Sequence, residues 1–507
     1  MLLASLASVS GSVAASSGRL VKIGLLADAL RAAGDSGEVP IAVAYLSGEL
    51  PQRQIGVGWA TLRSGFAPAA VASLTLSETD AAFSAIGAVS GKGSAGARRA
   101  LVEELFCRAT AAEQEFLFRL LSGELRQGAL EGVMTEAVAK AAAVPVAQVR
   151  RAAMLRGSLG PVAAAALAAG ALDGGAAALS AFGLSVGQPV RPMLAAAAPA
   201  MEDAFAKTSG EAAVEWKLDG IRVQAHVLPD SVRLFTRTLD DITSRMPEVV
   251  AELGKLPVTA AVLDGELIAL RPDGRPMPFQ DTAARAASGA GVALSAFYFD
   301  ALHLEGADLI DLPYWRRRSE LEWAVPAGLL MPRVVTSSVA EASAFFADAV
   351  AHGHEGVVVK ALDAPYAAGR RGAGWIKVKP RHTLDLVVLA VEWGHGRRRG
   401  VLSNLHLGAR DSSGEGFVML GKTVKGLTDS LLEWQTSRLL ELETHRDSYT
   451  VYVRPELVVE IAFDGVQRSP RYPGGLALRF ARVLRYREDK TAAEADTIET
   501  VRTLSPE

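Results

Sequence analysis

Lys217 stands out as a candidate nucleophile because of the residues around it. It lies in the run Glu-Trp-Lys-Leu-Asp-Gly-Ile-Arg at 215–222. Asp219 and Gly220 form a turn signal, and residues 221–227 then alternate between apolar and polar types, as in a half-buried strand. The pattern predicts that Lys217 ends a strand at the mouth of a pocket. A lysine in such a place can attack an electrophile when burial or a neighbouring cation lowers its pKa from about 10.4.

Paired charges on other predicted strands indicate an anionic partner and a metal. Asp264 and Glu266 alternate along one strand, and Lys377 and Lys379 alternate along another, so each pair shares a strand face. Two lysines flanked by apolar residues would neutralise a triphosphate. The carboxylates of Glu266 and Glu355 would suit Mg²⁺, which takes few protein oxygens and completes its shell with substrate phosphates. The alternative for each pair is that both side chains lie on the solvent-exposed face of an edge strand and bind nothing.

The overall composition is that of a globular chain with several domains. At 507 residues, 50% hydrophobic and 21% charged, the chain is too long for one core. Its net charge of -3 excludes a uniformly basic surface, so any nucleic-acid contact must come from local patches such as Arg98-Arg99. The single cysteine, Cys107, permits neither an intrachain disulfide nor a cysteine zinc site. A reducing, cytoplasmic setting is expected, with association to the nucleoid in a prokaryote.

No stretch has the length and apolarity of a membrane span. The most apolar run, at 159–172, extends over about 14 residues, too few to cross a bilayer. The first basic residue is Arg19, so the start of the chain lacks the charged region of a secretory signal and reads as a helix. No membrane role is expected.

Periodicity divides the chain into three predicted domains. Residues 1–185 are rich in alanine and leucine at helical spacing, for example at 100–121 and 131–143, which predicts an all-α domain. Glycine and proline cluster at 183–192 and mark a linker. A domain at 186–383 is expected to be α+β, because short alternating segments mix with two helical ones. The strands are predicted at 232–236, 261–270, 296–302, 356–362 and 375–378, and the helices at 248–253 and 339–350.

The third domain, 384–507, is predicted to be a small β-barrel of the oligonucleotide-binding (OB) type. Glycine-rich turns separate its strands, and one helical segment interrupts them near 430–444. The strands are expected around 386–391, 402–407, 416–420, 451–453 and 457–463.

The run at 215–222 resembles motif I of the ATP-dependent DNA ligases, members of the covalent nucleotidyltransferase superfamily. Segments resembling the remaining motifs follow in the family order, at 235–241 (Ia), 263–266 (III), 297–300 (IIIa), 355–360 (IV), 375–379 (V) and 479–490 (VI). One departure is Ala481, where many relatives carry proline, but the charged positions are intact. More loosely, Leu-Ser-Gly-Glu-Leu-Arg-Gln-Gly at 121–128 is similar to the helical DNA-binding domain of three-domain ligases. Arg126, expected at an exposed corner between helices there, could reach a DNA phosphate; a solvated arginine at a helix junction is the alternative.

The resemblance implies a reaction in three steps. Lys217 would attack the α-phosphate of ATP and form lysyl-AMP, releasing pyrophosphate. The AMP would pass to the 5'-phosphate of a nick in duplex DNA, and the adjacent 3'-hydroxyl would displace it. Because motif VI must reach the pyrophosphate and then make way for DNA, the C-terminal domain is expected to move about a hinge at 380–383.

The resemblance also assigns roles to the other site residues. Glu215 would read the adenine amino group and Phe299 would stack on the base. Glu355, together with Glu266, would place Mg²⁺, for which Mn²⁺ could substitute. The residues expected at the ribose, the phosphates or the DNA end are Arg222, Arg237, Glu266, Arg371, Lys377 and Lys379, and those expected at the pyrophosphate are Arg487, Asp489 and Lys490.

Four other classes of protein share some of these sequence features. An RNA ligase or an mRNA-capping guanylyltransferase has the lysine motif, but neither is expected to carry the long helical domain, and the capping enzyme would form lysyl-GMP. An NAD-dependent ligase resembles only the core and carries a cysteine zinc site. A non-catalytic nucleic-acid scaffold would not need Lys217, Glu266, Glu355 and Lys377. A monomer is expected, and the sequence identifies no clamp or polymerase partner.

Overall fold

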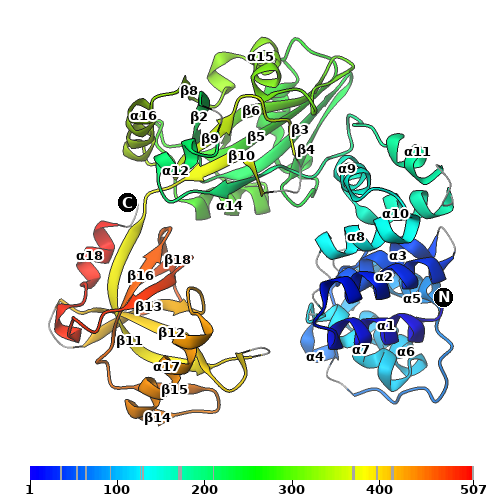
Figure 1. Cartoon of the computed structure of the whole chain (residues 1–507), viewed down its shortest axis with the longest axis horizontal. Coiled ribbons are helices and arrows are strands. Elements are labelled where there is room, and N and C mark those ends of the chain that lie inside the picture. Colours follow the sequence, from blue (N-terminus) through cyan, green and yellow to red (C-terminus); the bar gives the residue numbers. More distant parts are fainter. Residues whose placement is uncertain are drawn as a thin grey trace.

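The computed structural model of the chain has three regions of different architecture, shown in Figure 1. It describes all residues except 35–36, 53–54, 63–64, 92, 126, 128–130, 170–173, 209, 368–370, 396–397, 413–415 and 505–507, and it describes only the backbone of 60 and 371–373. A helical region is followed by a mixed α/β region and a β-rich region, which confirms the predicted fold class. Figure 1 shows the first and last regions on the same side of the middle one. None of the described helices combines the length and apolarity that crossing a bilayer requires.

The helical region packs around one apolar core. Leu6, Leu26, Tyr45, Phe83 and Leu117 are fully buried there, because apolar side chains recur at helical spacing and face inward. The helices are α1 Leu3–Ala15, α2 Arg19–Ala33, α3 Glu38–Ser47, α4 Trp59–Leu62, α5 Leu76–Ala88, α6 Ser94–Arg108, α7 Ala111–Leu121, α8 Glu131–Ala142, α9 Val146–Arg156, α10 Leu159–Ala168 and α11 Gly174–Ser180.

The helical pattern at 100–121 belongs to two helices, not to one. α6 ends at Arg108, and Ala109 is extended. Thr110 and Glu113 then form a capping box, in which the Glu113 carboxylate accepts from the Thr110 backbone N–H at 2.8 Å. The Thr-x-x-Glu spacing was a visible start signal for α7.

The middle region contains two five-stranded sheets with a shared core between them. Their strand orders are β1-β10-β9-β2-β8 and β4-β3-β5-β6-β7, with β1 parallel to β10 and the remaining pairs antiparallel. Helices α12 and α16 pack on the first sheet, and α13, α14 and α15 pack against the second.

The sequence predicted β3, β4, β5, β6, β9, β10, α13 and α16 to within four residues, but it did not predict β1, β7, β8, α12, α14 and α15. The strands are β1 Leu194–Ala197, β2 Ala212–Lys217, β3 Ile221–Leu228, β4 Ser231–Thr236, β5 Ala261–Ala269, β6 Leu294–Leu304, β7 Ala307–Asp308, β8 Arg333–Thr336, β9 Gly356–Ala361 and β10 Arg371–Val378. The helices are α12 Met201–Phe205, α13 Pro247–Leu253, α14 Phe279–Ser288, α15 Tyr314–Ala324 and α16 Val339–Ala351, with short 3-10 turns at Thr243–Arg245 and Ala327–Leu329.

The C-terminal region is a barrel-like sheet with a hairpin and two helices. Its sheet runs β13-β12-β11-β15-β14, and β16 pairs with both β11 and β19. β11 begins at His382, which pairs with Phe463, so this strand starts inside the expected hinge. The strands are β11 His382–Trp393, β12 Leu402–Arg410, β13 Phe417–Thr423, β14 Glu443–Arg446, β15 Thr450–Val453, β16 Val458–Phe463, β17 Gly465–Arg468, β18 Leu476–Arg479 and β19 Arg482–Tyr486. The helices are α17 Asp429–Glu441 and α18 Ile498–Thr503, with a 3-10 turn at Ala492–Glu494.

Candidate active site

A pocket of about 1120 Å³ opens between the middle and C-terminal regions. Residues from both sheets of the middle region line it, so the side chains come from segments far apart in the sequence. It gathers many of the site residues predicted from the sequence: Glu215, Lys217, Arg222, Arg237, Glu266, Phe299, Glu355, Lys377 and Lys379.

Lys217 ends β2, at the point where the chain crosses from one sheet to the other. Residues 218–220 make the crossing, and β3 begins at Ile221 in the second sheet. At Gly220 the turn passes so close to β5 that a Cβ would lie 2.2 Å from the Leu267 carbonyl oxygen. The glycine of the Lys-Leu-Asp-Gly run is therefore a steric requirement, and it fixes Lys217 at the pocket mouth as predicted.

Glu355 lies beside Lys217 because β9 begins opposite the end of β2. The Glu355 backbone N–H donates to the Lys217 carbonyl at 3.0 Å. Gly356, which follows, has φ +134°, and a Cβ there would lie 2.3 Å from the Val378 carbonyl oxygen. This close approach of β9 to β10 brings Glu355 within reach of both Lys217 and Lys379.

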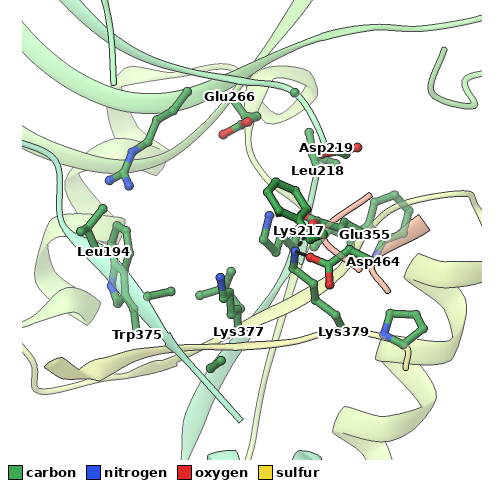
Figure 2. A pocket seen from close by; sticks show the side chains of 18 of the residues that line it. Leu194, Lys217, Leu218, Asp219, Glu266, Glu355, Trp375, Lys377, Lys379 and Asp464 are labelled. Atoms are coloured by element: carbon green, nitrogen blue, oxygen red, sulfur yellow. Dashed lines mark hydrogen bonds and ion pairs between the residues drawn. The ribbon is translucent and has the colours of Figure 1, made fainter. Parts of the chain in front are cut away.

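Both lysines form ion pairs with the Glu355 carboxylate, as Figure 2 shows. Lys379 also pairs with Asp464 of the C-terminal region at 3.1 Å. Burial raises the pKa of Glu355, but the charges of Lys217 and Lys379 outweigh burial and hold that pKa below its usual value. Glu355 is therefore ionised at neutral pH.

Lys377 adds a third cation to the pocket. Burial and then the charges of Lys379 and Lys217 lower its pKa. A cation whose pKa is lowered by burial and by neighbouring cations would be stabilised by an anion, and a phosphate would supply that charge.

Glu266 lies across the pocket from this cluster (Figure 2). Burial raises its pKa to about 7, although the charges of Lys217 and Arg222 oppose the shift. A carboxylate with this pKa is poised to take up or release a proton near neutral pH.

Arg222 is fixed rather than mobile. Its Nε and Nη2 donate to the Asp264 carboxylate at 2.9 and 2.6 Å, and its Nη1 donates to the Met193 carbonyl at 2.5 Å. The Tyr366 hydroxyl donates to the same carboxylate at 2.6 Å. Asp264 therefore positions Arg222. The sequence placed Asp264 only on the same strand face as Glu266, and it indicated neither its pairing with Arg222 nor the part played by Tyr366.

Phe299 reaches the pocket through a bulge in β6. The register pairs Asp264 with Asp300 and Gly265 with Tyr298, which leaves Phe299 as the extra residue. A bulge redirects the side chain of its extra residue, and here the ring lines the pocket, edge-on to Trp375 at 5.7 Å between centroids.

The Glu215 carboxylate, at the base of the pocket, is held by buried donors. Lys360 Nζ lies 2.5 Å from one oxygen, and the Tyr314 hydroxyl donates to the other. Arg318 lies 3.4 Å from that second oxygen. Lys360 sits over the Phe299 and Trp375 rings at 4.6 and 4.4 Å. Tyr314 and Arg318 come from α15. No motif or regular spacing in the sequence links them to Glu215, so they could not be predicted as its partners.

The structure does not bring Arg487, Asp489 and Lys490 to the pocket. Arg487 and Lys490 instead pair with Asp385, at 2.9 and 2.6 Å, and Arg487 also holds Asp489. The C-terminal region presents a different set of residues to the pocket: Lys425, Asp464, Arg479, Phe480 and Arg482.

Among these, Arg479 pairs with Asp219 of the turn that follows Lys217. Two predicted residues cannot be placed. Arg126 lies outside the described residues, and Arg371 begins β10 but its side chain is outside the described part. Of the basic patches, Arg98 donates to the Ile86 and Val89 carbonyls, which makes it a clamp on the end of α5.

Comparisons with known proteins agree with this geometry. Residues 192–379 match the "ATP dependent DNA ligase domain" model, 398–490 the "ATP dependent DNA ligase C terminal region" and 63–139 the "DNA ligase N terminus". The solved structure named "Pmar-Lig_Pre." is 19% identical with a TM-score of 0.64, covering 95% of this chain and 99% of that one, and so shares the fold.

Curated relatives match along the whole chain. A protein of Beutenbergia cavernae named "Probable DNA ligase" is 59% identical over 100% of both chains. One of the same name from Mycobacterium marinum is 58% identical over 99% of this chain and 100% of its own. The chain thus belongs to the ATP-dependent DNA ligases.

Proposed function

We propose that Lys217 carries the covalent chemistry of this ATP-dependent DNA ligase on nicked duplex DNA. The observation that supports it most directly is the placement of Lys217 in a pocket with Glu355, Lys377 and Lys379, at a turn that permits little movement of the backbone. Phosphoryl-type transfer is catalysed chiefly by positioning and by neutralisation of charge, and this pocket supplies both.

In the first step, the Lys217 amine attacks the α-phosphorus of ATP. A nitrogen–phosphorus bond forms, the bond to the bridging oxygen breaks, pyrophosphate leaves with that electron pair, and the nitrogen gives up a proton to solvent. Lys377 and Lys379 neutralise the α-phosphate oxygens, and Arg371 joins them from the start of β10. Binding of ATP would separate Lys217 from the Glu355 carboxylate with which it pairs, so that its nitrogen can reach the phosphorus.

Glu215 and Phe299 select the base. The Glu215 carboxylate keeps acceptor capacity beyond the donors it already has, and the adenine amino group would fill it. Guanine presents an oxygen at the corresponding position, which a carboxylate repels. Phe299 stacks on the base from the bulge in β6.

Glu355 and Glu266 are the groups that would hold a magnesium ion. Within the described residues, no cluster of three or more potential ligands could bind a metal alone. That composition fits Mg²⁺, which borrows ligands from the phosphates of its substrate. When bound, the ion supplies positive charge that reduces repulsion around the α-phosphate.

In the second and third steps, the lysyl-AMP is used on DNA. An oxygen of the 5'-phosphate attacks the AMP phosphorus and the Lys217 nitrogen leaves. The 3'-hydroxyl then attacks the 5'-phosphate and AMP leaves. Arg222 and Arg237 hold the phosphates of the DNA end, and Arg126 would contact the duplex elsewhere. A monomer working in the cytoplasm fits this role.

The test is labelling with ATP that carries a radioactive α-phosphate, in the presence of magnesium, followed by a denaturing gel and a nick-sealing assay. The wild-type chain should become labelled by ATP but not by GTP. Lys217→Ala should abolish labelling and sealing of an ordinary nick, yet retain sealing of a pre-adenylylated nick, because only the first two steps need the amine. Labelling of the Ala variant would exclude Lys217 as the nucleophile.

A further inference from the structure

The turn that carries Arg237 has an unusual backbone. β4 ends at Thr236, and the chain reverses through 237–240 so that the Thr236 N–H donates to the Asp240 carbonyl at 2.9 Å. Leu239, in this turn, has φ +66°, in the left-handed region that branched side chains rarely adopt. Such a conformation persists only when its surroundings hold it, and it often marks a functional constraint.

The surroundings of Leu239 include the helical region. Gly157 ends α9 in a left-handed conformation, with φ +73°. A Cβ at Gly157 would lie 3.0 Å from the Leu239 Cδ1 and 2.9 Å from the Pro189 carbonyl oxygen. The leucine methyl group therefore packs on a glycine surface that has no room for a side chain.

The end of α9 is itself fixed to the middle region. Gln188 exchanges two hydrogen bonds with Arg156, at 2.6 and 3.1 Å. Arg191 donates from its backbone to the Met154 carbonyl at 3.2 Å and from its Nε to the Gly157 carbonyl at 3.2 Å. Leu155 is buried in the core between the two sheets. Leu239 thus rests against a rigid support.

Arg237, two residues before Leu239, lines the nucleotide pocket. Its side chain is exposed, and none of the described residues forms a hydrogen bond or ion pair with it. The position of its side chain therefore depends on the backbone of the turn.

We propose that Leu239 is a positioning residue: its contact with Gly157 holds the 236–240 turn so that Arg237 points into the pocket. This inference rests on the proposed role of Arg237 at a phosphate. Through this contact, the helical region takes part in the chemistry of the pocket as well as in DNA binding.

The test is a double-mutant cycle on the separate steps. Lysyl-AMP formation and sealing of a pre-adenylylated nick are measured under single-turnover conditions with saturating substrate, for Leu239→Ala, Arg237→Ala and the double variant. Leu239→Ala should slow the step that Arg237→Ala slows, by roughly tenfold. In the Arg237→Ala background it should have no further effect, because the residue it positions is gone.

Two further variants separate positioning from a general loss of stability. Gly157→Ala disturbs the same contact from the helical side and should slow the same step, with a melting curve that shows a folded chain. Leu440→Ala removes the same atoms from a partly buried leucine in α17, far from the turn, and should leave both steps unchanged.

Several outcomes would overturn the inference. Additive effects of Leu239→Ala and Arg237→Ala, or an equal loss in Leu440→Ala, would show that Leu239 does not act through Arg237. If Arg237→Ala were fully active, the proposed role of Arg237 would fail and the inference with it. Slowing by Arg237→Ala without slowing by Leu239→Ala would overturn this inference alone.

Discussion

Glu355 is the residue on which two lysines of the pocket converge. Its carboxylate pairs with Lys217 on one side and Lys379 on the other. Before ATP binds, this arrangement keeps Lys217, the proposed nucleophile, in an ion pair and the carboxylate charged. The arrival of phosphates and a metal would give each lysine a new anion and Glu355 a new cation.

Replacement of Glu355 by glutamine tests this double role. Glu355→Gln keeps the shape of the side chain and removes its charge, so it should weaken magnesium binding and slow lysyl-AMP formation roughly 100-fold at a fixed magnesium concentration. Higher magnesium should recover part of the rate. The measurement is the rate of labelling by ATP across a magnesium titration.

The matched control is Glu456→Gln, an exposed glutamate of the C-terminal region that pairs only with Arg454 in the described structure. It should behave like the wild-type chain. A normal rate for Glu355→Gln at low magnesium would remove Glu355 from the metal site.

At the scale of the element, β3 connects the pocket to the linker from the helical region. Its Arg222 lies at the pocket, and its Gln224 and His226 hold the linker. The Gly187 N–H donates to His226 Nδ1 at 2.8 Å, and the Val190 N–H donates to Gln224 Oε1 at 2.8 Å. His226 Nε2 lies 2.9 Å from the same Gln224 oxygen, so the ring is neutral, with its proton on Nε2.

His226 should make the protein sensitive to acid. Burial, followed by the charges of Arg233 and His303, lowers its folded-state pKa from 6.5 to about 3. The unfolded chain therefore binds a proton below pH 6.5 while the folded chain does not, and stability falls as the pH drops from 6.5 towards 3. At pH 5 this loss should be about 2 kcal/mol.

His226→Asn keeps an acceptor for the Gly187 N–H but cannot titrate. Its melting temperature should be lower than that of the wild type at pH 7.5 and should fall less between pH 7.5 and 5. His354, whose pKa burial lowers to about 4, keeps part of the slope in both proteins. Parallel pH profiles of the melting temperature for the two proteins would show that His226 does not cause the loss of stability in acid.

The elements that the sequence predicted well are those whose apolar pattern is visible within one short stretch of the chain. β5 and β9 are short runs of mostly buried residues inside their sheets, and their observed ends lie within a residue of the expected ones. Features that depend on contacts between distant segments could not be predicted. The bulge at Phe299 is set by the register of β5 on β6, and the donors around Glu215 come from α15.

The residues of the site likewise divide into those that the sequence could predict and those that it could not. Lys217 could be proposed because the Asp219-Gly220 turn signal follows it, and Glu355 because its run resembles a known motif and a carboxylate suits magnesium. The ion pair of Lys490 with the Asp385 carboxylate could not be predicted. The motif indicates which residues the reaction needs, but not which residues they contact when they are away from the pocket.

At the scale of the whole molecule, the C-terminal region presents one of two possible faces to the pocket. Arg479 touches the turn after Lys217, whereas Lys490 lies with Asp385 away from it. Two faces of one domain that bear separate functional groups suggest separate steps. We expect the face with Arg479 to serve the nick and the face with Lys490 to serve ATP, with rotation about 380–383 between them.

A matched pair of alanine variants tests this rotation. Lys490→Ala should impair lysyl-AMP formation more than sealing of a pre-adenylylated nick, and Arg479→Ala should show the reverse. Both steps are measured by single-turnover kinetics. Equal losses in both steps for both variants would indicate one fixed arrangement.

Removal of the helical region tests how DNA is bound. A nick offers little sequence to read, so phosphate contacts should dominate the affinity and make it fall steeply with salt. The last residue of the deletion matters, because α9 contributes to the core of the middle region. Met154 and Leu155 of α9 pack between the two sheets, beside Phe299 and Trp375. Loss of residues 1–185 would open that core, whereas loss of residues 1–144 keeps it closed.

A chain without residues 1–144 should therefore still form lysyl-AMP but bind nicked DNA weakly and with a smaller salt dependence. Nick binding at two salt concentrations, for this chain and the full chain, is the measurement. Unchanged affinity would assign the helical region to a protein partner instead of DNA.

The single cysteine is a specific site for attaching a fluorescent dye. Cys107 is exposed on α6 in the helical region, so a maleimide dye will label the native chain at one position. A second cysteine at an exposed site of the C-terminal region, such as Ser448→Cys, would complete a donor–acceptor pair without any background substitution. Energy transfer between the two dyes could then report, molecule by molecule, whether the distance between the helical and C-terminal regions changes when nicked DNA is added.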